Sequence, residues 1–160
     1  MEYPKRKENR LQEFDYSSVG AYFITICTAG RKNSFWLDDC PVTAPENVAL
    51  TQVGSIVQNC ILAIPIHYPA VSVDCYAVMP NHVHLLLQIK SDADGRSLSA
   101  PTVSSVIRSL KGTASKQAGF SIWQKGFYDH VIRNDADYLS FMEYIVSNPI
   151  RWSEDKQCLI

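Results

Sequence analysis

Several signatures of common protein classes are missing from the 160 residues of this chain. No run of about 18 apolar residues occurs and residues 1–10 are polar and basic, so we expect neither a membrane-spanning helix nor a secretory signal. The five cysteines are odd in number and include no C-x-x-C pair, which argues against a zinc ribbon or a disulfide framework. The glycine-rich nucleotide-binding motifs are missing as well. These absences favour a cytoplasmic protein with reduced thiols.

The composition is that of one globular domain. The sequence is 46% hydrophobic and 11% aromatic, which is enough apolar material to form a core at this length. It contains no internal repeat, no low-complexity tract and no linker that would separate two domains. We therefore expect residues 1–160 to form a single domain, in which residues 1–15 are a flexible, basic N-terminal segment.

The charges are unevenly distributed although the formal net charge is only -1. Residues 95–134 contain six basic residues and one acid, so this stretch alone carries a charge of +5. A basic surface is one interpretation, and an ordinary solvated helix face is the other.

The pattern of apolar and turn-forming residues predicts an α+β fold. Short β-branched and aromatic segments predict strands at residues 21–28, 71–79, 83–89 and 128–132. Apolar residues three and four apart predict helices at residues 47–66 and 102–118, and a final helix capped by Asn134. This order implies a ferredoxin-like sandwich, in which helices pack on an antiparallel sheet of about four to five strands.

His82 and His84 stand two residues apart at the start of a predicted strand. Side chains alternate between the faces of a strand, so both imidazoles project to the same side and form a preformed pair of metal ligands. The opposite side of this strand is uniformly apolar and belongs to the core. In the alternative interpretation, the two histidines are only hydrogen-bonded structural residues.

The final helix carries a second polar feature. Tyr144 and Asn148 lie one turn apart, on one face and largely outside the apolar stripe of this helix. The simpler interpretation is a tyrosine at the edge of the core and an asparagine that ends the helix before Pro149.

Taken together, these segments resemble a known family. The string Met79-Pro80-Asn81-His82-Val83-His84-Leu85-Leu86-Leu87 is followed by Trp123-Gln124, by Asp129-His130-Val131-Ile132-Arg133 and by Tyr144-Ile145-x-x-Asn148-Pro149. In content, order and spacing this series resembles the IS200-like single-tyrosine (HUH) transposases and, within them, the REP-associated tyrosine transposases. The resemblance covers nearly the whole chain.

The resemblance implies an enzyme that cleaves and rejoins DNA by transesterification. In the family, the His-hydrophobic-His pair and a polar residue four positions after the tyrosine bind a divalent cation, and the tyrosine is the nucleophile. On this sequence these roles fall on His82, His84 and Asn148 for the metal and on Tyr144 for the nucleophile. Such ligands suit Mg²⁺ or Mn²⁺. A phenol must also lose its proton before it attacks, and His130 is a candidate auxiliary base or a structural histidine.

The family chemistry also implies a covalent 5′-phosphotyrosine, a free 3′-hydroxyl and rejoining without ATP, because the ester bond is retained in the link to the protein. We expect single-stranded DNA with hairpins or palindromic repeats as the substrate. The candidate phosphate contacts are Lys5, Arg6, Lys7, Arg10, Arg108, Lys111, Lys116 and Arg133. The candidate base-stacking residues, if exposed, are Tyr22, Trp123, Phe127 and Tyr128.

Three questions stay open at the level of the sequence. The protein acts either as a monomer or as a homodimer, with the tyrosine serving its own subunit or the partner. A non-catalytic nucleic-acid-binding module on the same sheet is an alternative function. A metal-dependent phosphodiesterase that uses water as its nucleophile is another.

Overall fold

The computed structural model describes residues 19–37, 42, 44, 47–90 and 101–158. Its strands are β1 (Gly20–Cys27), β2 (Val71–Val78), β3 (His82–Ile89) and β4 (Tyr128–Val131), and they form one antiparallel sheet in the order β2-β3-β1-β4. Its helices are the 3₁₀ turn η1 (Ala29–Arg31) and the α-helices α1 (Gln52–Leu62), α2 (Ile64–His67), α3 (Val103–Ala118) and α4 (Asp135–Cys158). The expected α+β sandwich of the ferredoxin-like kind is confirmed.

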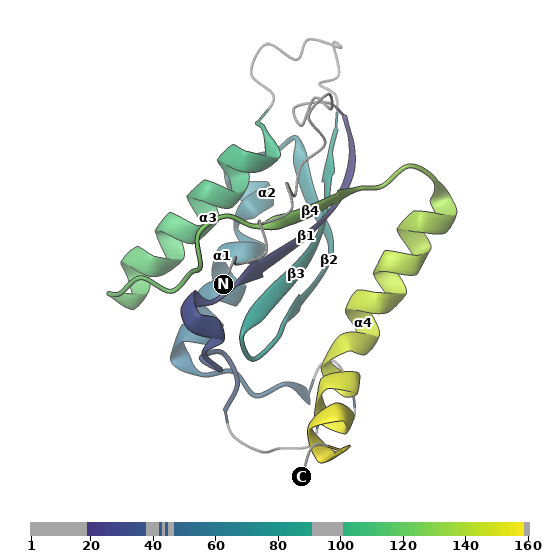
Figure 1. The fold of residues 1–160 in the computed structure, drawn as a ribbon. Coiled ribbons are helices and arrows are strands. Elements are labelled where there is room, and N and C mark those ends of the chain that lie inside the picture. The colour runs from purple at the N-terminus through teal and green to yellow at the C-terminus, as the bar shows by residue number, and fades with distance from the viewer. Residues whose placement is uncertain (1–18, 38–41, 43, 45–46, 91–100, 159–160) are drawn as a thin grey trace, which may run out of the picture.

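Helices cover both faces of the sheet (Figure 1). On one side α1, α2 and α3 enclose the main core, where the apolar residues of β1 and β3, such as Ile24 and Leu85, are 0% exposed. On the other side α4 packs against β2 and β3 over a smaller cluster that contains Leu86 and Ile145. Because strand residues alternate between these two sides, one face of β3 builds the core and the other faces α4.

The expected helix over residues 47–66 is wrong in its bounds. Thr51 has extended backbone, and its side chain accepts a hydrogen bond from the backbone N–H of Gly54, so α1 begins only at Gln52. Pro65 lacks an N–H and its ring would clash with the carbonyl of Ile61, so the chain turns at Ala63 into the separate, short α2.

The other predicted helix ends are confirmed. The C-cap of α3 is Gly119, whose φ of 84° is a left-handed conformation that glycine adopts without strain. At the start of α4, the side chain of Asn134 accepts a hydrogen bond of 2.8 Å from the backbone N–H of Asp137.

A helix end at Pro149 is wrong, because α4 continues through this proline to Cys158. A proline inside a helix costs about 3 kcal/mol through the lost hydrogen bond and the ring clash. Beyond it, Trp152 packs against the smaller cluster under α4 and against His82. These contacts on the far side of Pro149 offset the local penalty.

No helix in the described part of the chain is long and apolar enough to cross a membrane. The predicted N-terminal segment 1–15 lies outside the described residues.

The approach of α1 to the segment after η1 depends on a glycine. A Cβ built on Gly54 would lie 2.3 Å from the backbone oxygen of Phe35, so an alanine here forces the backbone apart. We expect Gly54→Ala to lower the free energy of unfolding by about 2 kcal/mol, as overpacking in a core does. Gly112 in α3 is the matched control: its Cβ would meet nothing within 4 Å, and Gly112→Ala should raise the free energy of unfolding by about 0.5–1 kcal/mol. Urea denaturation measures both, and equal effects of the two substitutions would contradict this packing.

Candidate active site

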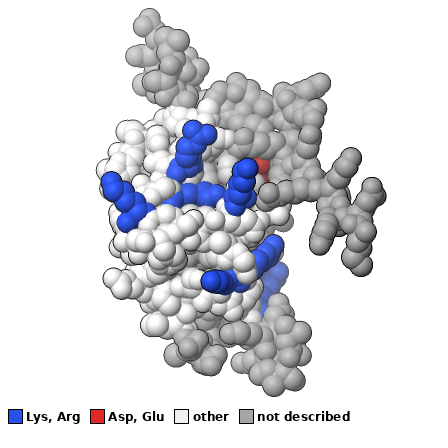
Figure 2. Space-filling model, turned by 60° about the vertical axis from the view of Figure 1, so that its left-hand side comes forward, with Lys and Arg blue, Asp and Glu red and all other residues white. Residues whose placement is uncertain are grey.

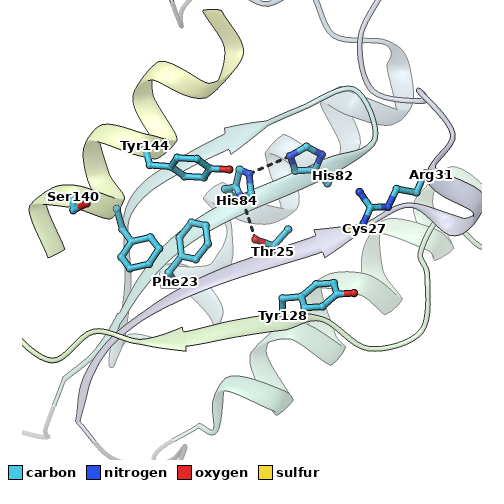
Figure 3. Close-up of a pocket in the computed structure, with 10 residues that line it drawn as sticks. Phe23, Thr25, Cys27, Arg31, His82, His84, Tyr128, Ser140 and Tyr144 are labelled. Atoms are coloured by element: carbon cyan, nitrogen blue, oxygen red, sulfur yellow. Dashed lines mark hydrogen bonds between the residues drawn. The ribbon is translucent and has the colours of Figure 1, made fainter. Parts of the chain in front are cut away.

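Two imidazoles face one another at the start of β3. His82 is the first residue of this strand and His84 the third, so both side chains project from the face that α4 covers. Their Nε2 atoms are 3.1 Å apart (Figure 3). The structure thus brings the two side chains together as strand alternation predicts.

The outward ring nitrogen of each histidine contacts a polar side chain. Nδ1 of His82 lies 2.7 Å from Oδ1 of Asn81, an acceptor, so His82 carries its proton on Nδ1. Nδ1 of His84 lies 2.9 Å from the hydroxyl of Thr25, which can accept a proton from it. Without an ion between them, the facing Nε2 atoms at 3.1 Å are hydrogen-bonded, so one of them carries a proton. With both protons on the Nδ1 atoms instead, the two Nε2 lone pairs would face one metal ion, an arrangement typical of histidines that bind a metal.

Burial keeps both rings neutral. Desolvation, together with the charge of Arg31, lowers the pKa of His82 to about 4. Desolvation and the neighbouring His82 lower the pKa of His84 to about 3, and only 4% of His84 is exposed. Both imidazoles are therefore uncharged at neutral pH, the state in which they bind a metal.

Tyr144 reaches the histidine pair from α4 of the same chain. Its ring centroid lies 5.4 Å from that of His84 and 6.0 Å from that of Phe23. The next residue, Ile145, is 0% exposed in the cluster under α4, and this burial fixes the rotation of the helix. Tyr144 itself is 41% exposed, and its hydroxyl is directed toward the two histidines (Figure 3). A substrate can therefore reach the phenol beside the imidazoles.

A hydrogen bond at the other end of α4 ties the helix to the sheet. The hydroxyl of Tyr138 donates to Oδ2 of Asp74 on β2 at 2.6 Å. This bond, with some burial, raises the pKa of Tyr138 to about 12, so the phenol keeps its proton and stays the donor. Tyr138 is thus a structural tyrosine, in contrast to Tyr144.

Asn148 occupies the next turn of α4. It lies four residues after Tyr144 and four before Trp152, so all three share one face of the helix. Tyr144 contacts His84, and Trp152 lies 5.9 Å from His82 between ring centroids. The helical period therefore places Asn148 on the face toward the histidine pair, although Asn148 does not line the pocket described next.

A pocket of about 580 Å³ joins these elements. Its walls come from β1, β3, α4 and the edge of the sheet, and the residues are Phe23, Thr25, Cys27, Arg31, His82, His84, Tyr128, Ser140, Phe141 and Tyr144 (Figure 3). The pocket lies on the sheet face away from the main core. It therefore offers one space in which a ligand contacts the histidines and the tyrosine together.

Arg31 was missed as a site residue by the sequence analysis. It is exposed, lines the pocket and has a φ of 53°, which is uncommon for a residue other than glycine. The only sequence signal is the preceding Gly30, which marks a turn directly after β1. Nothing in the string itself indicates that this turn lies beside His82.

The spacing of the two imidazole nitrogens is compatible with one divalent cation bound by both. Two nitrogen ligands about 2.1 Å from one ion stand about 3.0 Å apart when they subtend a right angle, close to the 3.1 Å between the facing Nε2 atoms. No group of three or more His, Cys, Asp or Glu side chains that could hold a metal occurs among the described residues. Further ligands would come from Asn148, water or a substrate.

The predicted phosphate contacts fall into three groups. Lys5, Arg6, Lys7 and Arg10 lie outside the described residues, whereas Arg108, Lys116 and Arg133 are exposed. Lys111 instead donates to the backbone oxygens of Gln124 and Gly126, and burial lowers its pKa. Figure 2 shows lysine and arginine side chains gathered on the side of the molecule where α3 lies, with almost no acidic surface between them.

The remaining candidates differ in position. His130 pairs with Asp137 at 3.1 Å and does not line the pocket, so the structure does not bring it to Tyr144. Of the candidate stacking residues, Tyr22 and Trp123 are in the main core and Phe127 is half-buried against it. Tyr128 is 38% exposed and lines the pocket.

No family model matches the chain, but individual proteins do. An uncharacterized protein of Haemophilus influenzae is 31% identical over 94% of this chain and 92% of its own length. A second H. influenzae protein, provisionally named a REP-associated tyrosine transposase, is 26% identical over 86% of this chain and 74% of its own length. The REP-associated tyrosine transposase of Escherichia coli is 24% identical over 89% of this chain and 73% of its own length.

The fold is found in a solved structure as well. A REP-associated tyrosine transposase bound to a REP hairpin superposes with a TM-score of 0.62 at 22% identity, over 89% of this chain and 73% of that one. Named relatives align over most of the chain and the same fold recurs in this structure, in agreement with the motifs around His82 and Tyr144. The chain therefore belongs to the IS200-like family of REP-associated tyrosine transposases.

Proposed function

We propose that this protein is a metal-dependent transposase that nicks and rejoins single-stranded DNA beside hairpins through a covalent 5′-phosphotyrosine on Tyr144. One observation carries the proposal: the ring centroids of Tyr144 and His84 are 5.4 Å apart, and both residues line the same pocket as His82. Metal-assisted phosphoryl transfer needs a nucleophile and ligands that hold the metal ion beside it, and this pocket contains both kinds of group.

His82, His84 and Asn148 would hold the divalent cation, Mg²⁺ or Mn²⁺. When bound, the cation neutralises charge on the phosphate oxygens and makes the phosphorus more electrophilic. Asn81 and Thr25 keep the two imidazoles oriented, because each contacts the outward nitrogen of one ring.

The chemistry of this chain centres on the hydroxyl of Tyr144. Its oxygen attacks the phosphorus of the scissile phosphodiester, a new P–O bond to tyrosine forms, and the bond between phosphorus and the 3′-oxygen breaks. The proton lost from the phenol is balanced by protonation of the 3′-oxygen. Attack by a 3′-hydroxyl on the phosphotyrosine reverses these steps, so rejoining consumes no ATP.

The tyrosine acts within its own subunit in this proposal. Tyr144, His82 and His84 of one chain already share a pocket, with α4 held on the same sheet by Tyr138 and Asp74. A monomer therefore contains all the groups named above.

A single strand beside a hairpin is the substrate that the surface favours. The exposed phenol of Tyr144 can reach a flexible strand more readily than a phosphate constrained in a duplex. The basic side of α3 offers charge for the phosphates of a stem (Figure 2). The structural neighbour bound to a REP hairpin supports DNA of this shape.

Substitution of the nucleophile tests the covalent step. The protein is incubated with Mg²⁺ or Mn²⁺ and end-labelled single-stranded oligonucleotides that carry the palindromes flanking its own gene, and a denaturing gel detects protein linked to DNA. Tyr144→Phe removes only the hydroxyl, so we expect the adduct and the cleavage to disappear while binding persists. Tyr138→Phe is the control on the same helix: it removes the hydrogen bond to Asp74 but leaves the hydroxyl of Tyr144, so it should still form the adduct.

Two results would contradict this prediction. Cleavage by Tyr144→Phe without an adduct would point to the phosphodiesterase that uses water. DNA binding without cleavage by the unsubstituted protein, on the flanking palindromes as well, would point to the non-catalytic binding module.

The metal site predicts a graded loss of Mn²⁺ affinity. His84→Ala removes a ligand and should weaken Mn²⁺ binding by at least about a hundredfold, whereas Thr25→Val removes only the support of Nδ1 and should weaken it by about tenfold. Electron paramagnetic resonance of free Mn²⁺ measures both without DNA. Unchanged binding in His84→Ala would show that the pair is structural.

A further inference from the structure

Arg31 and Tyr128 line the pocket but have no part in the chemistry above. Arg31 follows the end of β1, and Tyr128 begins the edge strand β4. We propose that they form a nucleotide-binding subsite, in which Arg31 binds a phosphate next to the scissile one and Tyr128 stacks on the adjoining base. The inference rests on the proposed function, because it places the DNA strand relative to Tyr144.

The backbone of Arg31 is held in an unfavourable conformation by specific contacts. Its φ of 53° follows the left-handed Gly30, and its N–H donates to the carbonyl of Thr28 at 3.1 Å. Its carbonyl accepts a hydrogen bond of 3.4 Å from the side chain of Asn81, the residue that also holds His82. Non-glycine residues in this region cluster at functional sites, where the strain persists because the position of the side chain matters.

The side chain of Arg31 is available for a phosphate. It is exposed, lines the pocket and makes no ion pair with a carboxylate among the described residues. It lies at the same end of the pocket as His82 (Figure 3). An arginine fork matches two phosphate oxygens, so this exposed guanidinium suits the DNA backbone.

Tyr128 lies in the same row of the sheet as the metal ligand His84. Thr25 of β1 pairs with His84 on one side and with Tyr128 on the other, so all three side chains project from one face. Neighbouring strands are ~4.8 Å apart, which places Tyr128 about 10 Å from His84. A base at Tyr128 would therefore belong to a nucleotide beside the cleaved phosphate rather than to the reacting group.

The exposure of Tyr128 sets it apart from the other candidate stacking residues. It is 38% exposed, while Tyr22 and Trp123 are core residues. No hydrogen bond of its hydroxyl is found among the described residues. Bases stack on exposed aromatic rings irrespective of their sequence.

The first experiment measures binding with the Tyr144→Phe protein, which cannot cleave, and a fluorescein-labelled single strand carrying the flanking palindrome. We expect Arg31→Gly to weaken binding about tenfold. The slope of log affinity against log salt should fall by about 0.7, the value for one phosphate on a single strand. Arg31→Lys retains the charge and should keep the slope but lose part of the affinity.

The same variant separates binding from folding. Glycine adopts a positive φ without strain, so the thermal midpoint of Arg31→Gly should be equal or higher. A lower midpoint with an unchanged salt slope would show that Arg31 is structural and would overturn its assignment.

The second experiment follows stacking on Tyr128. In Tyr144→Phe protein, 2-aminopurine placed in turn at each single-stranded position should be quenched at one of them. Tyr128→Leu should abolish this quenching and weaken binding about tenfold, whereas Tyr128→Phe should retain both, because stacking needs the ring and not the hydroxyl. Quenching that survives in Tyr128→Leu would overturn the stacking role.

The subsite and the proposed function fail in different ways. If the unsubstituted Tyr144 forms an adduct but Arg31→Gly and Tyr128→Leu leave its formation and its KM unchanged, the subsite is wrong and the strand-transfer function stands. If no adduct forms and yet both variants lose binding, the covalent mechanism is wrong and the subsite stands.

Discussion

The pairing of β1 with β3 is the constraint on which the site depends. The antiparallel register places Thr25 opposite His84 and Cys27 opposite His82. A shift by one residue would turn Val83 toward α4 and both histidines into the main core. The imidazoles would then be buried among aliphatic side chains and could not reach the pocket. The apolar face of the two strands excludes that shift, because the main core is built from it. The hydrophobic effect thus selects the register, and the register positions the chemistry.

The same separation of faces explains how a tyrosine on a surface helix is held near buried histidines. Ile145 and Leu86 bury the inner side of α4, so the neighbouring Tyr144 is left at the rim of the contact, partly in solvent. Exclusion from water lowers the pKa of both histidines and keeps them neutral, whereas the phenol needs access to a substrate. One helix packed over one end of the pocket satisfies both conditions. Trp152 extends this contact beyond Pro149, next to His82.

Much of this arrangement could be predicted from local rules. Alternation in β3 predicts that His82 and His84 share a face, and the four-residue spacing predicts that Tyr144 and Asn148 share another. Strand and helix positions followed from periodicity, and Gly119 and Asn134 identified helix ends. The helix through Pro149 was not predicted, because the contacts that offset the proline are tertiary. Arg31 escaped for the same reason, and Tyr128 could not be distinguished from three other candidate stacking residues, since the place of both in the pocket depends on which strands become neighbours.

Asn81 shows how the turn of the β2–β3 hairpin couples the separate parts of the pocket. Its Oδ1 accepts from Nδ1 of His82, its Nδ2 donates to the carbonyl of Arg31, and its backbone oxygen accepts from Thr28. Asn81 is only 9% exposed, so these contacts are shielded from competition with water. An aspartate could serve His82 but could not donate to Arg31, and a leucine would leave both partners unsatisfied. The residue before the histidine pair therefore links the metal ligands to the strained turn at Arg31.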